Sequence, residues 1–258
     1  MSLYCLDVKS NNIQNDFVIG DIHGQFNEFV HALTRYDKIT DANIIVLGDV
    51  GMGFYKENYY HNILKKINTK LKKNNINLFF FRGNHDDPQY FKDSKYNKSN
   101  IFFIDDYTVI KTLSHTILCV GGARSIDKCE RWKWNKFTQK IVTDGWWDGE
   151  RVLAIPENFS NNIQEYKEID VVCTHCAPIN VEFDTKGIPN KYIEKDETLL
   201  DEINEDQTIL YNLWEIVKPS KWYYGHYHHN KTENIEPTMF YACKDFVAGY
   251  KTPLVPLY

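Results

Sequence analysis

Five short apolar runs in this chain end directly in Asp, Asn or His residues, with glycines beside them. The runs cover residues 17–19, 43–47, 77–81, 171–174 and 221–224. Short continuous apolar runs are typical of strands buried on both faces of a sheet. In open α/β sheets, ligands bind beyond the carboxyl ends of such strands. We therefore expect the five strand ends to meet at one shared metal site.

The residues after these runs have the chemistry of metal ligands. Divalent cations bind carboxylate oxygen, imidazole nitrogen and amide oxygen. Asp21 and His23 stand two positions apart at a strand end, so both side chains can point to the same ion. Glycines such as Gly48 and Gly225 flank the ligand positions and allow the backbone to approach closely.

The first third of the chain alternates between strand and helix patterns. Apolar residues at helical spacing predict helices over residues 25–36 and 57–73, between the first three strands. This alternation calls for parallel strands joined by right-handed crossovers.

The remainder of the chain is more varied. Short strands at 101–104, 107–110 and 116–120 have no helices between them and predict a second, more antiparallel sheet. Further elements are expected as helices at 158–167 and 199–217, a polar loop at 180–196, and one or two strands within 238–256. We interpret the aromatic-rich segment 123–150 as an irregular lid or loop, and residues 1–258 as a single domain.

Composition excludes several classes of protein. The 258 residues have a net charge of −5, so charge gives no reason to expect nucleic-acid binding. The sequence has no run of 18 apolar residues for a membrane span, and its first 16 residues lack the apolar core of a signal peptide. Six cysteines in a chain of this length do not form a disulfide framework. We therefore expect a cytoplasmic protein.

The motifs together resemble the calcineurin-like metallophosphoesterase superfamily. They occur in the family's order as Asp21-x-His23-Gly24, Gly48-Asp49, Gly83-Asn84-His85-Asp86, His175 and Gly225-His226-x-His228. The resemblance implies an α/β fold in which two mixed β-sheets pack as a sandwich flanked by helices. It also implies a dinuclear metal centre at the strand ends.

The resemblance implies a role for each residue of these motifs. One metal would be bound by Asp21, His23, Asp49 and His228. The other would be bound by Asp49, Asn84, His175 and His226, so that Asp49 bridges the two ions. A metal-bound hydroxide would attack phosphorus in line, and His85 would protonate the leaving oxygen.

One motif departs from the serine/threonine protein phosphatases, which the blocks around Asp21 and His85 otherwise resemble. Those enzymes have Asp-Arg-Gly at the second block, whereas Asp49 is followed here by Val50-Gly51. Another acid must then orient His85, and Asp86 or Asp87 is the candidate. Another arginine must bind phosphate, because guanidinium pairs with it bidentately. The candidates for that role are Arg82, Arg124 and Arg131.

The leading hypothesis is a metal-dependent phosphoester hydrolase that acts on a phosphoprotein or a nucleotide. Two divalent metal ions are expected, with manganese as the first choice and iron, zinc or nickel as alternatives. A phosphodiesterase or nuclease acting on nucleotides or nucleic acid is one alternative. A catalytically silent protein-binding scaffold on the same fold is the other.

Overall fold

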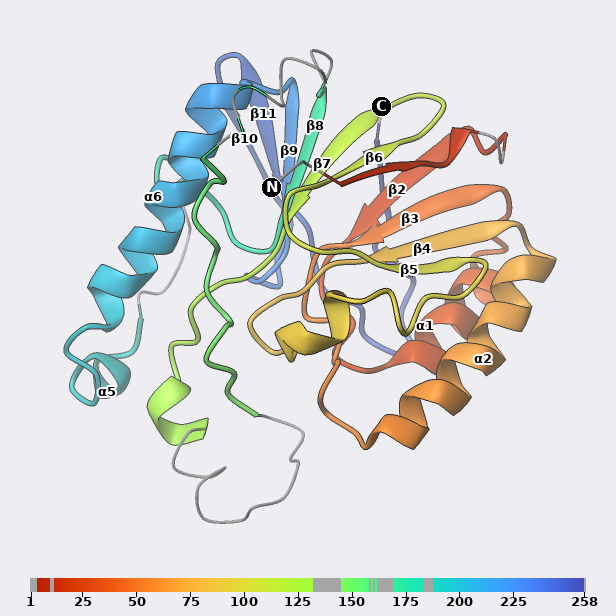
Figure 1. Cartoon of the computed structure of the whole chain (residues 1–258), viewed down its shortest axis with the longest axis horizontal. Helices are drawn as coiled ribbons and strands as arrows, with labels where there is room; N and C mark the ends of the chain where they lie inside the picture. Colours follow the sequence, from red (N-terminus) through yellow and green to blue (C-terminus); the bar gives the residue numbers. More distant parts are fainter. Residues whose placement is uncertain are drawn as a thin grey trace.

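Two β-sheets lie next to one another in this computed structural model, and helices cover the outer face of each sheet (Figure 1). The structure describes residues 4–9, 12–131, 145–157, 159, 161, 169–182 and 188–257. The arrangement confirms the predicted α/β sandwich of two mixed sheets flanked by helices.

The smaller sheet has five strands in the order β12-β2-β3-β4-β5. Their bounds are β2 Asn15–Ile19, β3 Ala42–Val46, β4 Ile76–Phe80, β5 Ile101–Phe103 and β12 Val255–Pro256. Strands β2 to β5 pair in parallel, and only β12 pairs antiparallel, along β2. The parallel pairing expected for the first third of the chain is therefore confirmed, and the carboxyl ends of β2, β3 and β4 lie at one edge.

The larger sheet has seven strands in the order β1-β6-β7-β8-β9-β11-β10. Their bounds are β1 Cys5–Asp7, β6 Thr108–Lys111, β7 Thr116–Val120, β8 Val171–Thr174, β9 Lys221–Tyr224, β10 Lys231–Ile235 and β11 Thr238–Ala242. Only the β6–β7 and β10–β11 pairs are antiparallel. The expected second sheet with more antiparallel pairing is therefore present around β6 and β7. The predicted strand 101–104 does not belong to it, because β5 pairs in parallel with β4 in the smaller sheet.

Helices cover the two outer faces. Helix α2 (Glu57–Lys73) packs on the five-stranded sheet beside α1 (Phe26–His31), which continues as the π-helix η2 (Ala32–Tyr36). Helix α6 (Leu199–Val217) lies on the outer side of the seven-stranded sheet (Figure 1). The predicted bounds of α2 and α6 are both confirmed. Two short elements, the 3₁₀-helix η3 (Pro88–Phe91) and α5 (Asn190–Ile193), lie within connections.

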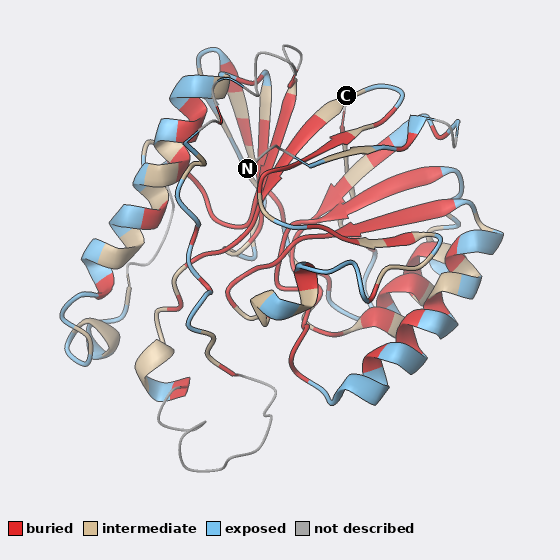
Figure 2. Ribbon diagram, in the orientation of Figure 1, coloured by how far each residue is buried: buried red, intermediate tan, exposed pale blue. Residues whose placement is uncertain are grey.

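Three groups of buried apolar side chains lie between the layers of the sandwich. The first lies between α1, α2 and the five-stranded sheet, and the second lies between α6 and the seven-stranded sheet. The third lies between the sheets, where Val18 and Phe79 of one sheet meet Ile117 and Cys173 of the other. Both sheets are consequently buried along most of their central strands (Figure 2). This burial on both faces explains why the strand sequences are continuously apolar.

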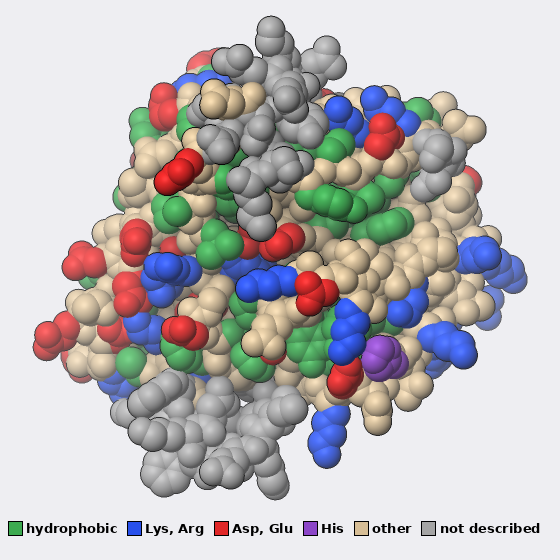
Figure 3. Space-filling view, in the orientation of Figure 1, with side chains coloured by type: hydrophobic (Ala, Val, Ile, Leu, Met, Phe, Trp, Pro, Cys, Tyr) green, Lys and Arg blue, Asp and Glu red, His purple; other side chains and the backbone are tan. Residues whose placement is uncertain are grey.

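Charged side chains gather on the helical edges of the molecule. Figure 3 shows Lys and Arg along the edge formed by α2, and Asp and Glu along the opposite edge formed by α6. Lys65, Lys66, Lys72 and Lys73 of α2 are exposed, as expected for the solvated face of a helix.

Some expectations concern parts of the chain outside the described residues. Residues 132–144 of the predicted lid and most of the predicted helix 158–167 are among these parts. None of the described helices is long and apolar enough to cross a membrane. The single-domain organisation stays a prediction.

Candidate metal centre

The loops that leave β2, β3, β4, β8 and β9 bring all seven predicted ligands to the junction of the two sheets. Of these residues, Asp21, Asp49, Asn84 and His175 are at most 2% exposed. Among the described residues, three groups of side chains at this junction have ligand atoms close enough to share an ion, and they are Asp21–His23–His228, His23–Asp49–His85 and Asp49–His175–His226. The convergence expected from the strand ends is therefore present in the structure.

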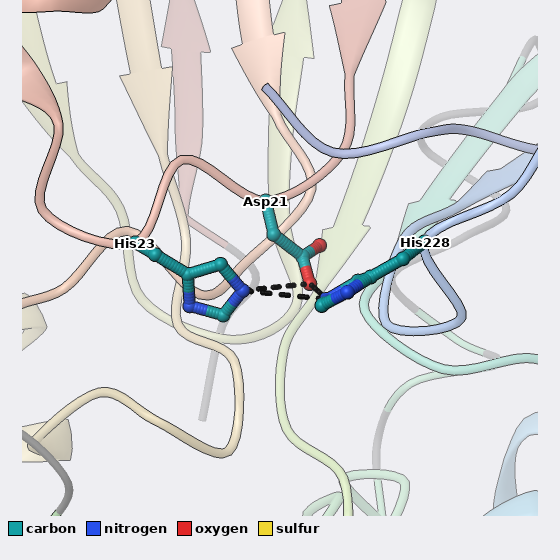
Figure 4. Close-up of side chains that lie close together, drawn as sticks. All are labelled: Asp21, His23 and His228. Atoms are coloured by element: carbon teal, nitrogen blue, oxygen red, sulfur yellow. Dashed lines mark hydrogen bonds and ion pairs between the residues drawn. The ribbon is translucent and has the colours of Figure 1, made fainter. Parts of the chain in front are cut away.

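The first group is formed by Asp21, His23 and His228 (Figure 4). The Oδ2 atom of Asp21 lies 2.8 Å from His228 Nε2 and 3.7 Å from His23 Nε2. The two Nε2 atoms lie 3.3 Å apart. Two imidazole nitrogens and one carboxylate oxygen thus face a common point, although they come from positions about two hundred residues apart in the chain.

We call Asp49–His175–His226 the second ligand group. It surrounds His175, which is fully buried. Its Nδ1 lies 2.7 Å from the carbonyl oxygen of Leu47, and a carbonyl can only accept, so Nδ1 donates the hydrogen. The other nitrogen, Nε2, lies 2.9 Å from Asn84 Oδ1 and 3.3 Å from Asp49 Oδ1. His226 completes the group through its proximity to Asp49 and His175.

This second arrangement fits a cation. In the neutral ring, Nε2 of His175 has a lone pair and faces two acceptor oxygens, Asn84 Oδ1 and Asp49 Oδ1. Such contacts between acceptors are repulsive unless a positive charge lies between them. Burial opposes a charged imidazole, but the carboxylate of Asp49 raises the pKa of His175 to about 9. Burial likewise favours a neutral Asp49, yet His175 and His85 lower the pKa of Asp49 well below its usual range. The group therefore attracts a proton, and a divalent ion would satisfy the same atoms.

The backbone around the ligands is unusually close and strained. A Cβ atom on Gly83 would lie 2.1 Å from Asp49 Oδ1, and one on Gly225 would lie 2.6 Å from Asp21 Oδ1, so only glycine fits at either position. Four of the ligand residues have left-handed backbone conformations with positive φ. They are His23 (φ 44°), Asp49 (φ 45°), His226 (φ 66°) and His228 (φ 53°).

His85 lies at the rim of the centre beside Arg131. The backbone N–H of His85 donates to Asp49 Oδ1 at 2.8 Å, and its ring Nε2 lies 3.8 Å from Asp49 Oδ2. Arg131 Nη2 lies 2.7 Å from His85 Nε2, while Arg131 Nε forms an ion pair with Asp127 at 2.9 Å. The Nδ1 atom of His85 is buried without a hydrogen-bond partner among the described residues. Burial lowers the pKa of His85, and the charge of Arg131 lowers it further, against the opposing effect of Asp49.

Asp86 does not contact the ring of His85. Its carboxylate accepts hydrogen bonds from the backbone N–H groups of Val50, Gly51, Met52 and Gly83 at 2.7–2.9 Å. Burial and the neighbouring Asp49 raise its pKa to about 6. The neighbouring candidate Asp87 accepts from Gln89 N as the N-cap of η3. Asp86 therefore fixes the loop after β3, which corrects the expectation that it orients His85.

The three candidate arginines have different surroundings. The Arg82 guanidinium is buried, pairs with Asp106 at 2.8 Å, and donates to the carbonyl groups of residues 149–151. All of its donor nitrogens are occupied by these partners, which corrects the expectation of a phosphate contact. Arg124 lies 3.7–3.9 Å from three carboxylates of α6. Of the three, only Arg131 contacts a residue of the ligand groups through its guanidinium.

Sequence reasoning missed two buried residues next to the ligands, Ser125 and Glu150. Asn84 Nδ2 donates to Ser125 Oγ at 2.9 Å, and Ser125 Oγ donates to Glu150 Oε2 at 2.6 Å. Glu150 is fully buried, which raises its pKa to about 7. Neither residue belongs to a motif, and Glu150 lies in the charged, aromatic segment that we interpreted only as a lid. No sequence signal identified them.

A cavity of about 540 Å³ opens beside the centre. Asp49, Asn84 and His85 form one end of its lining, and Arg131 and Asp206 contribute charge to its walls. Apolar and polar side chains of α6 also line the cavity. The volume lies within the range of about 300–1,000 Å³ that small-molecule sites occupy.

Comparison with known proteins agrees with this geometry. Residues 17–230 match the family described as calcineurin-like phosphoesterase. Among solved structures, the chain is similar to TT1561 of Thermus thermophilus, with 13% identity, a TM-score of 0.53 and 90% of each chain covered. It also matches a putative 5′-nucleotidase from Staphylococcus aureus, with 15% identity, a TM-score of 0.49, and 88% of this chain and 48% of that chain covered.

The two-sheet fold and the paired Asp and His groups define a metallophosphoesterase, a hydrolase that acts on phosphoester bonds. The family match covers most of the sequence and spans all of the ligand loops described above. This chain belongs to the calcineurin-like phosphoesterase family.

Proposed function

We propose that the protein hydrolyses the phosphoester of a small molecule, with His85 as general acid and Arg131 as the phosphate ligand. The observation on which this proposal rests is the 2.7 Å contact between Arg131 Nη2 and His85 Nε2 at the mouth of the cavity. It brings an anion-binding group and a proton-transfer group together beside Asp49, where the ligand groups meet.

The arrangement of donor atoms supports an assignment of the metal ligands. We assign one ion to Asp21, His23, Asp49 and His228, and the other to Asp49, Asn84, His175 and His226. When bound, two divalent ions lower the pKa of a water molecule and offset negative charge on the phosphoryl group. Manganese is our first choice, because the carboxylate and amide oxygens of Asp21, Asp49 and Asn84 suit it, and the imidazole ligands keep iron, zinc and nickel as alternatives.

His85 has the position required of a proton donor. Its ring is held at the edge of the centre by its own backbone N–H, which is bonded to Asp49. At present Nε2 accepts from Arg131, so the neutral ring has its hydrogen on Nδ1. An incoming phosphate attracts the Arg131 guanidinium and leaves Nε2 free. The negative charge of that phosphate also raises the pKa of His85 and favours the protonated acid.

Arg131 is the best phosphate ligand of the three arginines. A guanidinium pairs with phosphate through two parallel N–H groups, and the Arg131 guanidinium faces the cavity. Asp127 binds its Nε and leaves the outer nitrogens directed toward His85 and Ser125. Arg124 lies further along the cavity, where the α6 carboxylates already neutralise it.

The cavity favours a small substrate over a folded phosphoprotein. Its walls could enclose an organic group of nucleotide size, and a protein surface could not enter it. The polar side chains Asn204, Asp206 and Gln207 of α6 also line the cavity, where they can accept or donate hydrogen bonds to the organic part. A nucleotide or a similar phosphorylated metabolite is therefore our proposed class of substrate.

The test is an assay of manganese-reconstituted protein against four classes of substrate, namely nucleotide monoesters, cyclic nucleotides, bis-esters and a phosphoprotein. We expect turnover of small esters and none of the phosphoprotein. Asp49→Asn should abolish turnover, because it removes the shared carboxylate. Preferred cleavage of diesters or nucleic acid would establish the nuclease alternative. Full metal loading with no turnover of any ester would establish the scaffold alternative.

A further inference from the structure

Asn84 can bind a metal ion only through the oxygen atom of its side-chain amide. The amide has an oxygen that coordinates cations and an –NH₂ group that repels them, and a half-turn exchanges the two. In the structure Oδ1 points to His175 Nε2 at 2.9 Å, toward the second ligand group. Some other contact must hold the –NH₂ group on the opposite side.

Ser125 and Glu150 provide that contact. Asn84 Nδ2 donates to Ser125 Oγ at 2.9 Å, so the hydroxyl oxygen acts as an acceptor there. The hydroxyl hydrogen points instead to Glu150 Oε2 at 2.6 Å, while Glu150 Oε1 accepts from Ser125 N at 2.9 Å. All three residues are at most 2% exposed, so water cannot replace any of these partners.

We propose that Glu150 is a positioning residue that acts through Ser125 to hold Asn84 with its oxygen toward the metal site. The two carboxylate oxygens of Glu150 accept from Ser125, one from its backbone N–H and the other from its hydroxyl, so the hydroxyl hydrogen points to Glu150. That direction fixes the hydroxyl, and the hydroxyl fixes the amide. Partners of this kind typically change metal affinity by about 10- to 100-fold when they are lost.

The backbone of Glu150 is itself fixed by a buried charge. Arg82 Nη1 donates to the carbonyl oxygen of Glu150 at 2.9 Å, and Ala123 N donates to the same oxygen at 3.0 Å. Arg82 is in turn paired with Asp106. The buried arginine thereby holds Glu150 at the depth where its carboxylate meets Ser125.

The substitution Glu150→Gln tests the direction of the chain of hydrogen bonds. Glutamine has nearly the same shape, but its –NH₂ group can donate to Ser125 Oγ and turn the hydroxyl hydrogen toward Asn84. The amide of Asn84 would then rotate to present Oδ1 to Ser125 and its –NH₂ group to the metal site. We expect one of the two manganese ions to bind about 10- to 100-fold more weakly.

The experiment titrates the metal-stripped full chain with MnCl₂ and measures free Mn²⁺ by electron paramagnetic resonance. The decisive comparison uses Asn84→Asp as background, because an aspartate has oxygen on both sides and needs no orientation. Glu150→Gln should weaken one site in the native chain and change nothing in the Asn84→Asp chain. Glu202→Gln is the control, since Glu202 contacts Arg124 and Lys128 near the same cavity but not Asn84.

Two results would overturn the proposal. One is an unchanged manganese affinity in Glu150→Gln. The other is a loss of equal size in the Asn84→Asp background, which would indicate a general disturbance of the loop. If Glu150→Gln does not fold, as judged by thermal unfolding, Ser125→Ala replaces it and should weaken the same site. The proposal rests on the ligand role assigned to Asn84 under the proposed function. Because its test measures metal binding, absence of turnover in the native chain would contradict only the proposed function.

Discussion

Arg131 Nη2 donates a hydrogen bond of 2.7 Å to Nε2 of His85. A guanidinium has no acceptor, so the imidazole accepts through Nε2 and is neutral in this contact. Burial lowers the pKa of His85, and the adjacent positive charge lowers it further. The two side chains are therefore coupled, and removal of the Arg131 charge alters the protonation of His85.

Replacement of Arg131 by alanine should reduce kcat/KM by about 10- to 100-fold, because a charge-assisted hydrogen bond contributes roughly 1.5–3 kcal/mol. It should also raise the pKa of His85, since a repelling charge is gone. With His85 as the acid, the alkaline limb of the pH–rate profile moves to higher pH. Arg131→Lys is the control, which keeps the charge and should leave that limb in place. An unchanged alkaline limb in Arg131→Ala would show that Arg131 does not affect the pKa of His85 during turnover.

Replacement of His85 by asparagine should reduce kcat by about 10²–10⁴-fold, the usual contribution of a general acid. Manganese binding should change little, because His85 is not among the assigned ligands. The loss should be much smaller for a p-nitrophenyl ester, whose leaving group departs without a proton, than for an alkyl ester. Equal losses of kcat for both esters would show that His85 is not the general acid.

Asp86→Ala should destabilise the protein by about 3 kcal/mol or more, because the four backbone N–H groups lose a buried acceptor. The measurement is chemical denaturation of the metal-free chain. Asp87→Ala is the matched control. Asp87 accepts one hydrogen bond as an N-cap, so its substitution should lower the free energy of unfolding by about 1 kcal/mol. Similar losses for the two variants would show that Asp86 does not hold the loop after β3.

Asp206→Asn should stabilise the protein at pH 8 and have no such effect at pH 4. Burial raises the pKa of Asp206 from 3.8 to about 6 in the folded state, so the folded chain binds the proton more tightly than the unfolded chain. Stability therefore rises as pH falls from about 6 toward 4. Asparagine does not ionise and avoids a penalty on the order of 3 kcal/mol at pH 8.

The measurement for this variant is the unfolding midpoint across that pH range. Glu205→Gln is the control, since Glu205 is the exposed neighbour on the same helix and faces the same arginine. A stabilisation by Asp206→Asn that is independent of pH would contradict the proposed cause.

The sequence was sufficient to predict the strands around the centre and the convergence of its ligands. An apolar run that ends in Asp21 or His175 has only one place in a parallel sheet, because its carboxyl end meets those of its neighbours. The bounds of α2 and α6 were equally accessible, since their apolar residues recur at helical spacing. The strands β1 and β10 were missed because both are edge strands with partly exposed sequences, and β1 has only three residues.

The surroundings of the ligands could not be predicted in the same way. Whether Asp86 contacts His85 or the loop after β3 depends on how four N–H groups are directed, and sequence spacing does not contain that information. Arg82 and Arg131 are equally plausible phosphate ligands in the sequence. Only the fold shows that the carbonyl groups of residues 149–151 surround the first, whereas the second lines the cavity.

The left-handed backbone at His23, Asp49, His226 and His228 has a consequence for laboratory evolution. Non-glycine residues in this conformation cost about 1 kcal/mol each. Glycine at these four positions would relieve that strain while removing donor atoms. A library selected for heat resistance alone should therefore accumulate glycine at these positions. The selected variants should have higher unfolding temperatures and no longer bind the metal ions.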